Sequence, residues 1–337
     1  MGDVRLRSLL WISVVIALLL SAQVQAAKKQ YVCVFDPVGR DGDIFSMAKD
    51  IATEFLTLGV DLKLYPYTTE AAAVQDLKAG LCDAAILTGI KVREFNLFSS
   101  TLEAVGAIHD YDAMRVVLET LAQPKASKLF IQGDYEVTGV FPAGAVFIHL
   151  KNRSWVTVDS MRGRRIIVMY GDKVSSSMVA QVGGKAVNAD TSTFANKFKR
   201  DRADVVFAPA AVYEPLELYK GLEPDGGIIT QPINQLTLQM VTRKGAFPEG
   251  FGQQAREVVL DWFDQTIEVA LKAESKIEKQ FWVRPPKHEV EEFNEALRLA
   301  RIRLRDEGIY DARMLKILRK LRCRKTPEAK ECIRPEE

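Results

Sequence analysis

Two sets of residues in this chain have types and spacings that could perform catalysis, but neither is complete. Ser46 and Lys49 have the Ser-x-x-Lys spacing of penicillin-recognising enzymes, yet the companion motifs Ser-Asp-Asn and Lys-Thr-Gly are absent from the sequence. Asp83 and Asp204 resemble a carboxylate pair for acid–base work. Each comes at the start of an expected strand, however, which is the edge remote from a ligand site in an α/β sheet. We therefore expect structural roles, such as turn capping, and no enzymatic activity.

The histidines and cysteines form no metal-binding pattern. His109, His149 and His288 are scattered along the chain, and the spacing of the four cysteines matches no zinc site. The sequence predicts neither a metal nor another cofactor.

The cysteines have a second use, because disulfides form in exported proteins. Cys323 and Cys332 enclose a short segment of a tail with no apolar run, so a disulfide is the natural restraint there. Cys33 and Cys82 are expected on adjacent strands, three and six residues before the strand ends. At ~3.3 Å per residue this offset is about 10 Å, too far for a bond, so the sequence predicts that Cys33 and Cys82 are unbonded.

The first 26 residues have the pattern of a cleaved export signal. Arg5 and Arg7 precede an apolar run from Leu9 to Leu20, and Val24-Gln25-Ala26 fits the small-residue rule for cleavage after Ala26. The alternative is a retained membrane anchor, but the run is shorter than the ~20 residues that a spanning helix needs. We expect a periplasmic protein.

The charge of the chain is almost balanced. It has 46 Lys and Arg and 44 Asp and Glu, for a formal net charge of +2. A balance this close to neutral gives the whole protein no drive toward nucleic acid or an anionic membrane, and we expect no nucleic-acid partner.

Two stretches of the chain have the same plan, namely "DLKAGLCDAAILTG" from Asp76 and "KFKRDRADVVFAPA" from Lys197. Each runs from a helical pattern through a turn to an aspartate and then into a short apolar strand. Each closes a passage that alternates strand, helix, strand, helix, strand. Such alternation predicts a parallel α/β unit whose ligand lies beyond the carboxyl ends of its strands. Two facing units would enclose a ligand between them.

The chain therefore divides into two lobes and a helical end. β-prone stretches at Gly139–Trp155 and Ile233–Gly245 can cross between the lobes and form a hinge. The fold class is α/β, a two-lobed periplasmic-binding-protein fold with crossing hinge strands and C-terminal helices. The expected divisions are lobe I at 27–138, lobe II at 139–232, a return strand and long bracing helix at 233–282, and C-terminal helices and a tail at 283–337.

The order of the motifs resembles the solute-binding proteins of TRAP-type transporters, of the dicarboxylate-binding type. The resemblance rests on "LKAGLCDAAIL", "VDSMRGRRIIVM", "VGGKAV" and "KFKRDRADVVFAPAAVYEPLELYKGL", and covers about Lys28 to Trp282. It implies a small-molecule ligand, usually an organic anion, that is delivered to a membrane permease. We place the chain in a divergent branch of these proteins.

One departure from the family motif affects the ligand. Gly163 matches the motif's glycine, Arg165 its lysine, and Ile167 the arginine that normally grips the ligand carboxylate. Either Arg40, Arg93 or Arg165 replaces the missing charge, or the ligand is neutral or mainly apolar and is held by tyrosines and backbone. We favour the second option.

The candidate ligand contacts follow the strands of both lobes. Asp36 has an alternative role as a cap of the turn or of the following helix. The full set of expected contacts is Asp36, Arg40, Thr88, Gly89, Arg93, Arg165, Ile167, Tyr170, Pro209 and Tyr213.

These features favour a monomeric solute-binding protein that serves a membrane permease or a sensor. Two alternatives remain. The basic segment "KILRKLRCRK" is an interface if the protein is instead an adaptor of an envelope or efflux assembly. An enzyme built on the same fold needs a nucleophile and base beside Thr88 or Tyr213, where neither His nor Cys occurs.

Overall fold

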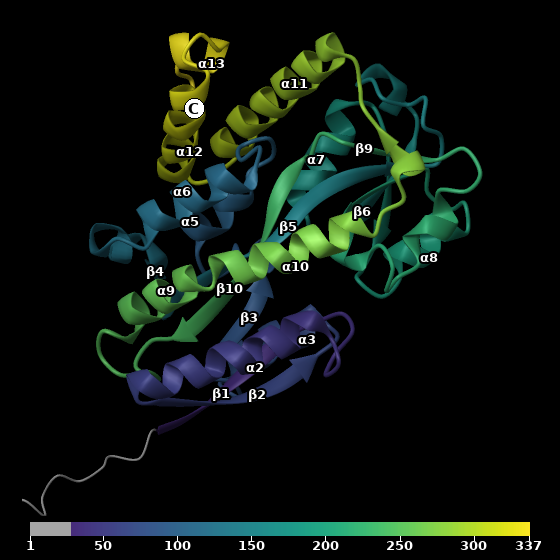
Figure 1. The fold of residues 1–337 in the computed structure, drawn as a ribbon. Coiled ribbons are helices and arrows are strands. Elements are labelled where there is room, and N and C mark those ends of the chain that lie inside the picture. The colour runs from purple at the N-terminus through teal and green to yellow at the C-terminus, as the bar shows by residue number, and fades with distance from the viewer. Residues whose placement is uncertain (1–27) are drawn as a thin grey trace, which may run out of the picture.

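A single mixed sheet runs through the computed structural model, which describes residues 28–337 (Figure 1). The signal peptide expected at residues 1–26 lies outside the described residues. The strands are β1 (Lys28–Phe35), β2 (Val60–Tyr67), β3 (Ala84–Thr88), β4 (Ile131–Gln132), β5 (Tyr135–Leu150), β6 (Arg165–Met169), β7 (Lys185–Ala189), β8 (Val205–Pro209), β9 (Gly227–Ile229), β10 (Asn234–Arg243) and β11 (Trp282–Val283).

Helices cover both faces of this sheet. They are α2 (Asp43–Phe55), α3 (Glu70–Ala79), α4 (Gly89–Val92), α5 (Leu97–Ser100), α6 (Tyr111–Leu121), α7 (Lys173–Gln181), α8 (Phe194–Lys199), α9 (Phe251–Asp261), α10 (Phe263–Ser275), α11 (Lys287–Asp306), α12 (Ala312–Lys325) and α13 (Lys330–Ile333). In the part of the chain that the structure describes, no helix combines the length and apolar composition needed to cross a membrane.

The strand order confirms the two parallel units, but it shows that they are parts of one sheet and not two separate sheets. Along the sheet the order is β2-β1-β3-β10-β5-β8-β6-β7. The outer strands repeat one topology, since β1 lies between β2 and β3 as β6 lies between β7 and β8, all in parallel. The crossing strands expected in both β-prone stretches are β5 and β10. The two crossing strands pair with each other, β10 also pairs with β3 of lobe I, and β5 also pairs with β8 of lobe II. The lobes therefore share one sheet rather than forming two.

Asp83 and Asp204 join adjacent strands at the edge of the sheet that is remote from the carboxyl ends of the parallel strands. The Asp83 carboxylate accepts the backbone N–H of Tyr31 at 2.9 Å, and the Asp83 N–H donates to the Tyr31 carbonyl at 2.7 Å. Asp204 and Arg165 make the same two bonds, both at 2.7 Å. The structural role predicted for both aspartates is confirmed, although they bridge strands instead of capping a turn.

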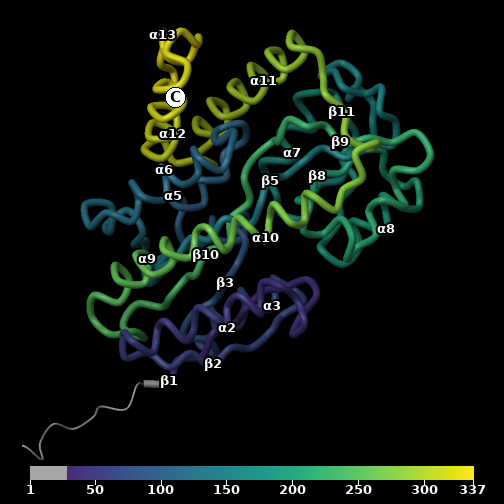
Figure 2. The backbone as a smooth tube through the Cα atoms, in the orientation of Figure 1, coloured from purple at the N-terminus to yellow at the C-terminus, as the bar shows by residue number. Residues whose placement is uncertain are grey.

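Two helices, not the single long helix expected, lie across both lobes (Figure 2). The helix is interrupted at Trp262, which lies between the end of α9 and the start of α10. The apolar face of α9 packs with α2 in lobe I, whereas α10 crosses β5 and reaches the segment after β8 in lobe II. A helix at this place still braces the lobes, but in two pieces.

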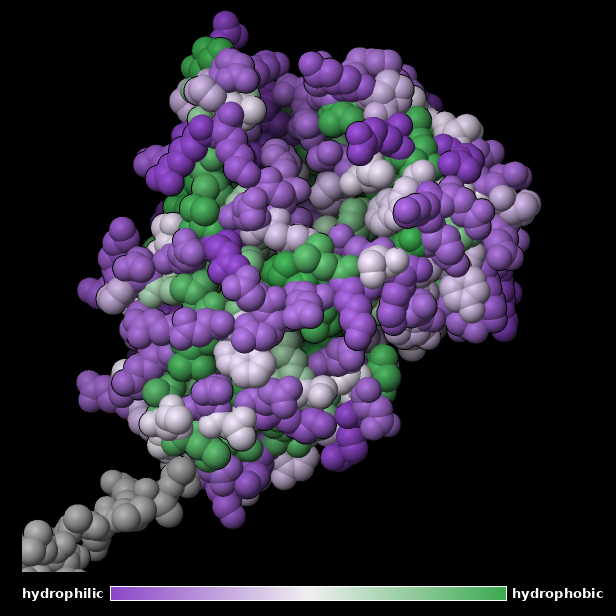
Figure 3. All heavy atoms as spheres, viewed as in Figure 1, coloured by the Kyte–Doolittle hydropathy of each residue, from purple (hydrophilic) through white to green (hydrophobic). Residues whose placement is uncertain are grey.

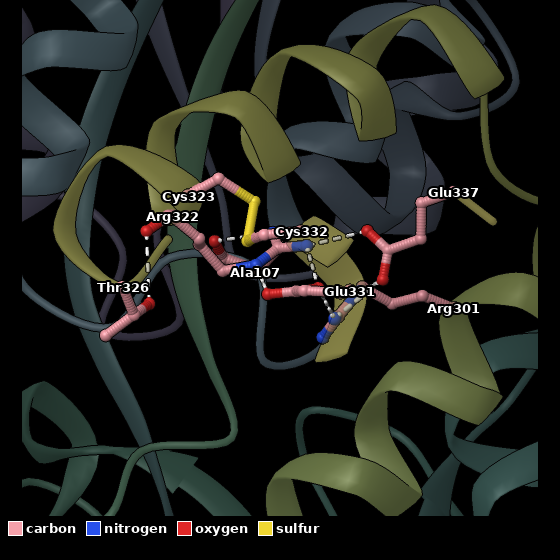
Figure 4. Close-up of a disulfide and its surroundings, with 8 residues drawn as sticks. All are labelled: Ala107, Arg301, Arg322, Cys323, Thr326, Glu331, Cys332 and Glu337. Atoms are coloured by element: carbon pink, nitrogen blue, oxygen red, sulfur yellow. Dashed lines mark hydrogen bonds and ion pairs between the residues drawn. A yellow bond between two sulfur atoms is a disulfide. The ribbon is translucent and has the colours of Figure 1, made fainter. Parts of the chain in front are cut away.

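The tail beyond α12 is held by buried charges instead of by an apolar core (Figure 4). The Arg322 guanidinium donates to Glu331 at 2.7 Å and to Glu337 at 2.6 Å, and Arg301 donates to Glu331 at 3.0 Å. Burial raises the pKa of Glu331, but the hydrogen bond and charge of Arg322 and the charge of Arg301 outweigh it and lower that pKa to about 2. Arg322 also donates to the carbonyl of Ala107, which fixes the tail to lobe I.

The two cysteine predictions have opposite outcomes. The disulfide predicted between Cys323 and Cys332 is present. The prediction for Cys33 and Cys82 is wrong, because they also form a disulfide, with a Cα–Cα distance of 5.9 Å. The expected register, which sets Cys33 opposite Ala85, is correct. The strand begins only at Ala84, however, and the N–H groups of Leu81 and Cys82 still bond to the Asp76 carbonyl of α3, so the turning chain brings Cys82 back beside Cys33.

We predict that all four cysteines resist alkylation when protein from an oxidising compartment is unfolded without reductant. Replacing Cys33 and Cys82 by alanine opens a loop with a sequence separation of 49 and lowers the free energy of unfolding by about 4 kcal/mol in urea titrations. The matched variant that replaces Cys323 and Cys332, with a separation of 9, loses about 3 kcal/mol. Free thiols at Cys33 and Cys82 in the unreduced protein would contradict the pairing.

Candidate functional site

The carboxyl ends of the parallel strands in the two lobes face each other across β5. Thr88, the last residue of β3, is level with Leu238 and through it with Phe141 of β5. Pro209, the last residue of β8, is level with Val146, five residues further along β5. Phe141 and Val146 are therefore at most roughly 16 Å apart along β5. We call the space between these strand ends the interlobe region.

The segment after β8 packs against α10. Lys276, just after α10, forms an ion pair with Glu214 of lobe II at 2.6 Å. The hydrogen bond to Glu214 raises the pKa of Lys276, and the negative charge of Asp43 in lobe I raises it further. This ion pair therefore attaches the end of α10 to lobe II.

Arg40 and Tyr170 are the predicted contacts that are exposed. Arg40 is exposed in the loop after β1, with its guanidinium 5.8 Å from the ring centroid of Phe45. Among residues 28–337 it has no acidic partner. Tyr170 follows β6 and is 58% exposed, and Pro209 is half-buried at the end of β8.

Asp36 has the structural role that was its alternative interpretation. Its side chain is buried, and its two carboxylate oxygens accept the N–H groups of Val38 at 2.8 Å and Phe45 at 3.0 Å. These bonds close the loop after β1 and begin α2. The Asp36 carboxylate is therefore engaged within the chain, and its contact with a ligand stays a prediction.

The amide groups at the end of β3 are already bonded to carboxylates of the chain. The N–H of Thr88 donates to Glu70 at 2.6 Å, and the N–H of Gly89 donates to Glu103 at 3.1 Å. A Cβ at position 89 would lie 2.4 Å from the Cδ of Glu103, so this approach requires glycine. Thr88 and Gly89 lie at the predicted edge, but a solute would have to compete for their amides.

Glu103 is a buried carboxylate that the sequence interpretation missed. Its Oε1 also accepts the N–H and the hydroxyl of Thr237 on β10, both at 2.7 Å, and so ties lobe I to a crossing strand. Burial raises the pKa of Glu103 to about 7, against the lowering effect of Thr237, of the Arg93 charge and of Gly89. Burial likewise raises the pKa of Glu70 to about 7. The sequence signal that could have revealed Glu103 is a single acidic residue inside an otherwise apolar helical stretch.

Arg93 and Tyr213 lie in the predicted parts of the molecule but are partly or wholly engaged. The Arg93 guanidinium is half-buried, 5.8 Å from the ring centroid of Tyr310. Tyr213 is 1% exposed, and its hydroxyl donates to Glu278 at 2.5 Å. A partner distant in the sequence therefore takes the Tyr213 hydroxyl, and contact of Tyr213 with a ligand stays a prediction.

Arg165 and Ile167 do not reach the interlobe region. Arg165 lies at the opposite end of β6 and donates from two nitrogens to Asp204, with its Nη2 at 2.6 Å. Ile167 is 3% exposed and belongs to the core that contains Phe147 and Phe198 under α8. One side chain is neutralised and the other is buried, so neither is available to a ligand in this arrangement, and their ligand contacts stay predictions.

We predict that Glu103→Gln changes how stability depends on pH. Folded Glu103 has its pKa raised from 4.5 to about 7, so between these values the folded protein binds more protons than the unfolded chain and becomes less stable as the pH rises. Glu103→Gln has no carboxyl group at this position and therefore does not lose this stability as the pH rises. Its free energy of unfolding relative to the wild type should therefore increase by about 3 kcal/mol between pH 4 and pH 8 in urea titrations.

The exposed Glu119 provides a matched control, and Glu119→Gln should follow the wild-type pH profile. A constant difference between Glu103→Gln and the wild type across this range would show that the pKa of Glu103 is not raised by folding.

Comparison with known proteins gives a consistent family. Residues 47–337 match the family model "Solute-binding protein AdeT 1/2". The chain is 38% identical over 299 residues to "Probable solute-binding protein AdeT1" of Acinetobacter baumannii, covering 89% of this chain and 98% of that protein. It is 27% identical over 232 residues to "Probable solute-binding protein AdeT2" of the same organism, covering 68% and 96%.

Solved structures establish the two-lobed fold. A TRAP periplasmic solute-binding protein from Desulfovibrio salexigens with bound orotic acid superposes with a TM-score of 0.73 at 11% identity, covering 88% of this chain and 99% of that one. A second, from Haemophilus influenzae with bound L-gulonate, gives 0.71 at 12%, covering 87% and 99%. Since the family model and AdeT1 each match most of its length, the chain belongs to the AdeT 1/2 family of solute-binding proteins.

Proposed function

We propose that this protein captures a small solute between its lobes in the periplasm and delivers it to a membrane transporter or sensor, without catalysing a reaction. The observation that carries the proposal is the opposition of the carboxyl ends of β3 and β8 across β5, since ligands of α/β sheets lie beyond these ends. Membership of a solute-binding family supports the same conclusion.

The crossing strands supply a hinge for this function. At the middle of β5, Gly144 has a φ of +97°, a conformation that favours glycine. The next N–H, of Ala145, donates to the Tyr111 hydroxyl at 3.0 Å, and this hydroxyl in turn bonds to Glu274 of α10. A solute that contacts both lobes stabilises the closed form over the open one, which is the condition for ligand-driven closure.

We infer that the solute is neutral or mainly apolar. Arg165 is paired with Asp204, and Ile167 is in the core, so neither provides a cation for a bound carboxylate. Glu70 and Glu103 already occupy the amide donors at the end of β3. Burying an unpaired anion is costly. The solved relatives with bound orotic acid and L-gulonate differ here, because both of those ligands carry a carboxyl group.

A thermal-shift screen tests the solute class. We predict that neutral or lipophilic compounds at 100 times their Kd raise the melting temperature by about 5 °C or more, whereas malonate and succinate at millimolar concentration leave it unchanged. The Tyr170→Ala variant should lose this rise. Tyr65→Ala, which removes another exposed tyrosine, on β2, should keep it.

Two outcomes would contradict the proposal in different ways. A dicarboxylate response that disappears in Arg40→Gln would show that Arg40 supplies the missing charge and that the solute is an anion. A rise in melting temperature that is lost in Tyr65→Ala but kept in Tyr170→Ala would place the site outside the interlobe region.

The location of the protein has a separate test. β1 begins at Lys28, two residues beyond the proposed cleavage site after Ala26. We predict that N-terminal sequencing of the protein from a periplasmic extract begins at Ala27. A chain that retains its first 26 residues and sediments with membranes would instead indicate an anchor.

A further inference from the structure

Helix α12 carries a concentration of positive charge that the rest of the chain only partly neutralises. It contains seven basic residues and no acidic one, namely Arg313, Lys316, Arg319, Lys320, Arg322, Arg324 and Lys325. Three of them are paired within the chain: Arg313 with Asp311, Arg322 with Glu331 and Glu337, and Lys325 with Asp110. The near-neutral total charge therefore hides a local excess.

Three of the remaining cations form one exposed row. Lys316, Lys320 and Arg324 follow one another at intervals of four residues, which places them along one side of the helix. All three are exposed, and none forms an ion pair with any of residues 28–337. Like charges at this spacing destabilise a helix, so folding alone does not favour the row.

An exposed apolar side chain follows the disulfide that attaches the tail to α12. The Cys323–Cys332 disulfide joins α13 to α12 beside Arg324, and Ile333, the next residue of α13, is 68% exposed. Figure 3 shows a hydrophobic spot at the α13 end of the molecule among hydrophilic side chains. We call Lys316, Lys320, Arg324 and Ile333 together the basic face.

The basic face is held rigidly on lobe I. The buried side chain of Arg322 bonds to Glu331 and Glu337 on one side and to the Ala107 carbonyl of lobe I on the other (Figure 4). Leu315 and Leu318 place the opposite side of α12 in the core. The row of cations therefore keeps a fixed direction relative to lobe I.

We propose that the basic face binds the anionic phospholipid headgroups of a membrane surface. Two of its three cations are lysines, flexible point charges that suit mobile headgroups better than the fixed bidentate partners that arginine favours. The row lies on a convex helix, and its one exposed aliphatic side chain can enter the headgroup boundary. Binding of this kind is weak and reversible. The inference goes beyond the proposed function and does not rest on the identity of the solute.

Vesicle sedimentation tests the proposal with the full mature chain. We expect wild-type protein to bind vesicles of phosphatidylglycerol and phosphatidylcholine at low salt, and to bind neither pure phosphatidylcholine nor the charged vesicles in 0.5 M salt, a concentration at which the Debye length is only about 4 Å. The triple variant Lys316→Gln, Lys320→Gln, Arg324→Gln should lower the partition coefficient on the order of 100-fold.

A control variant separates the basic face from total charge. Replacing the exposed Lys125, Lys128 and Lys272 by glutamine removes the same charge elsewhere and should change partitioning less than twofold. Equal losses in the two triple variants, or no preference for charged vesicles in the wild type, would overturn the proposal. Binding to native membranes that is absent from pure lipid would also overturn it and indicate an acidic protein partner.

Discussion

The pairing of β10 with both β3 and β5 is the constraint on which the molecule depends. Without β10 the parallel strands of lobe I would not be joined to β5, and β5 alone links that sheet to lobe II. The same pairing sets Thr88 and Pro209 facing each other. Glu103 adds a side-chain bond between lobe I and β10, because Thr237 donates to it from its backbone and its hydroxyl. The interlobe region is therefore defined by backbone register before any ligand-binding side chain is considered.

Several hydrogen-bond donors around the interlobe region are already occupied by carboxylates of the chain. Carboxylates of the chain hold the amides at the end of β3, and tyrosine hydroxyls bond to Glu274 and Glu278 of the α10 segment. These acids already fill donor positions that a bound carboxylate would need. The accessible groups, Arg40 and Tyr170, come from opposite lobes and lie on loops. Selectivity would then depend on closure, since neither group alone encloses a solute.

Sequence patterns predicted the backbone here better than the side chains. The repeated aspartates indicated where strands begin, and the predicted register of Cys33 opposite Ala85 is correct. The error at Cys82 arose because a helix terminus, not an extended strand, precedes Ala84. The hydrogen bond of the Tyr213 hydroxyl was missed for a different reason. Its partner Glu278 is 65 residues away, and no local pattern reveals which distant group will take a hydroxyl.

The placement of β10 also constrains the order in which the chain can fold. Leu238 pairs with Thr88, 150 positions earlier, whereas β6, β7 and β8 are close together in the sequence. Closing so long a loop loses more chain entropy than closing a short one, and contacts of large sequence separation slow folding. The parallel strands of lobe II can therefore assemble from local contacts as soon as they are available. Lobe I, although it comes first in the chain, has to keep the edge of β3 unpaired until residue 243 has joined it.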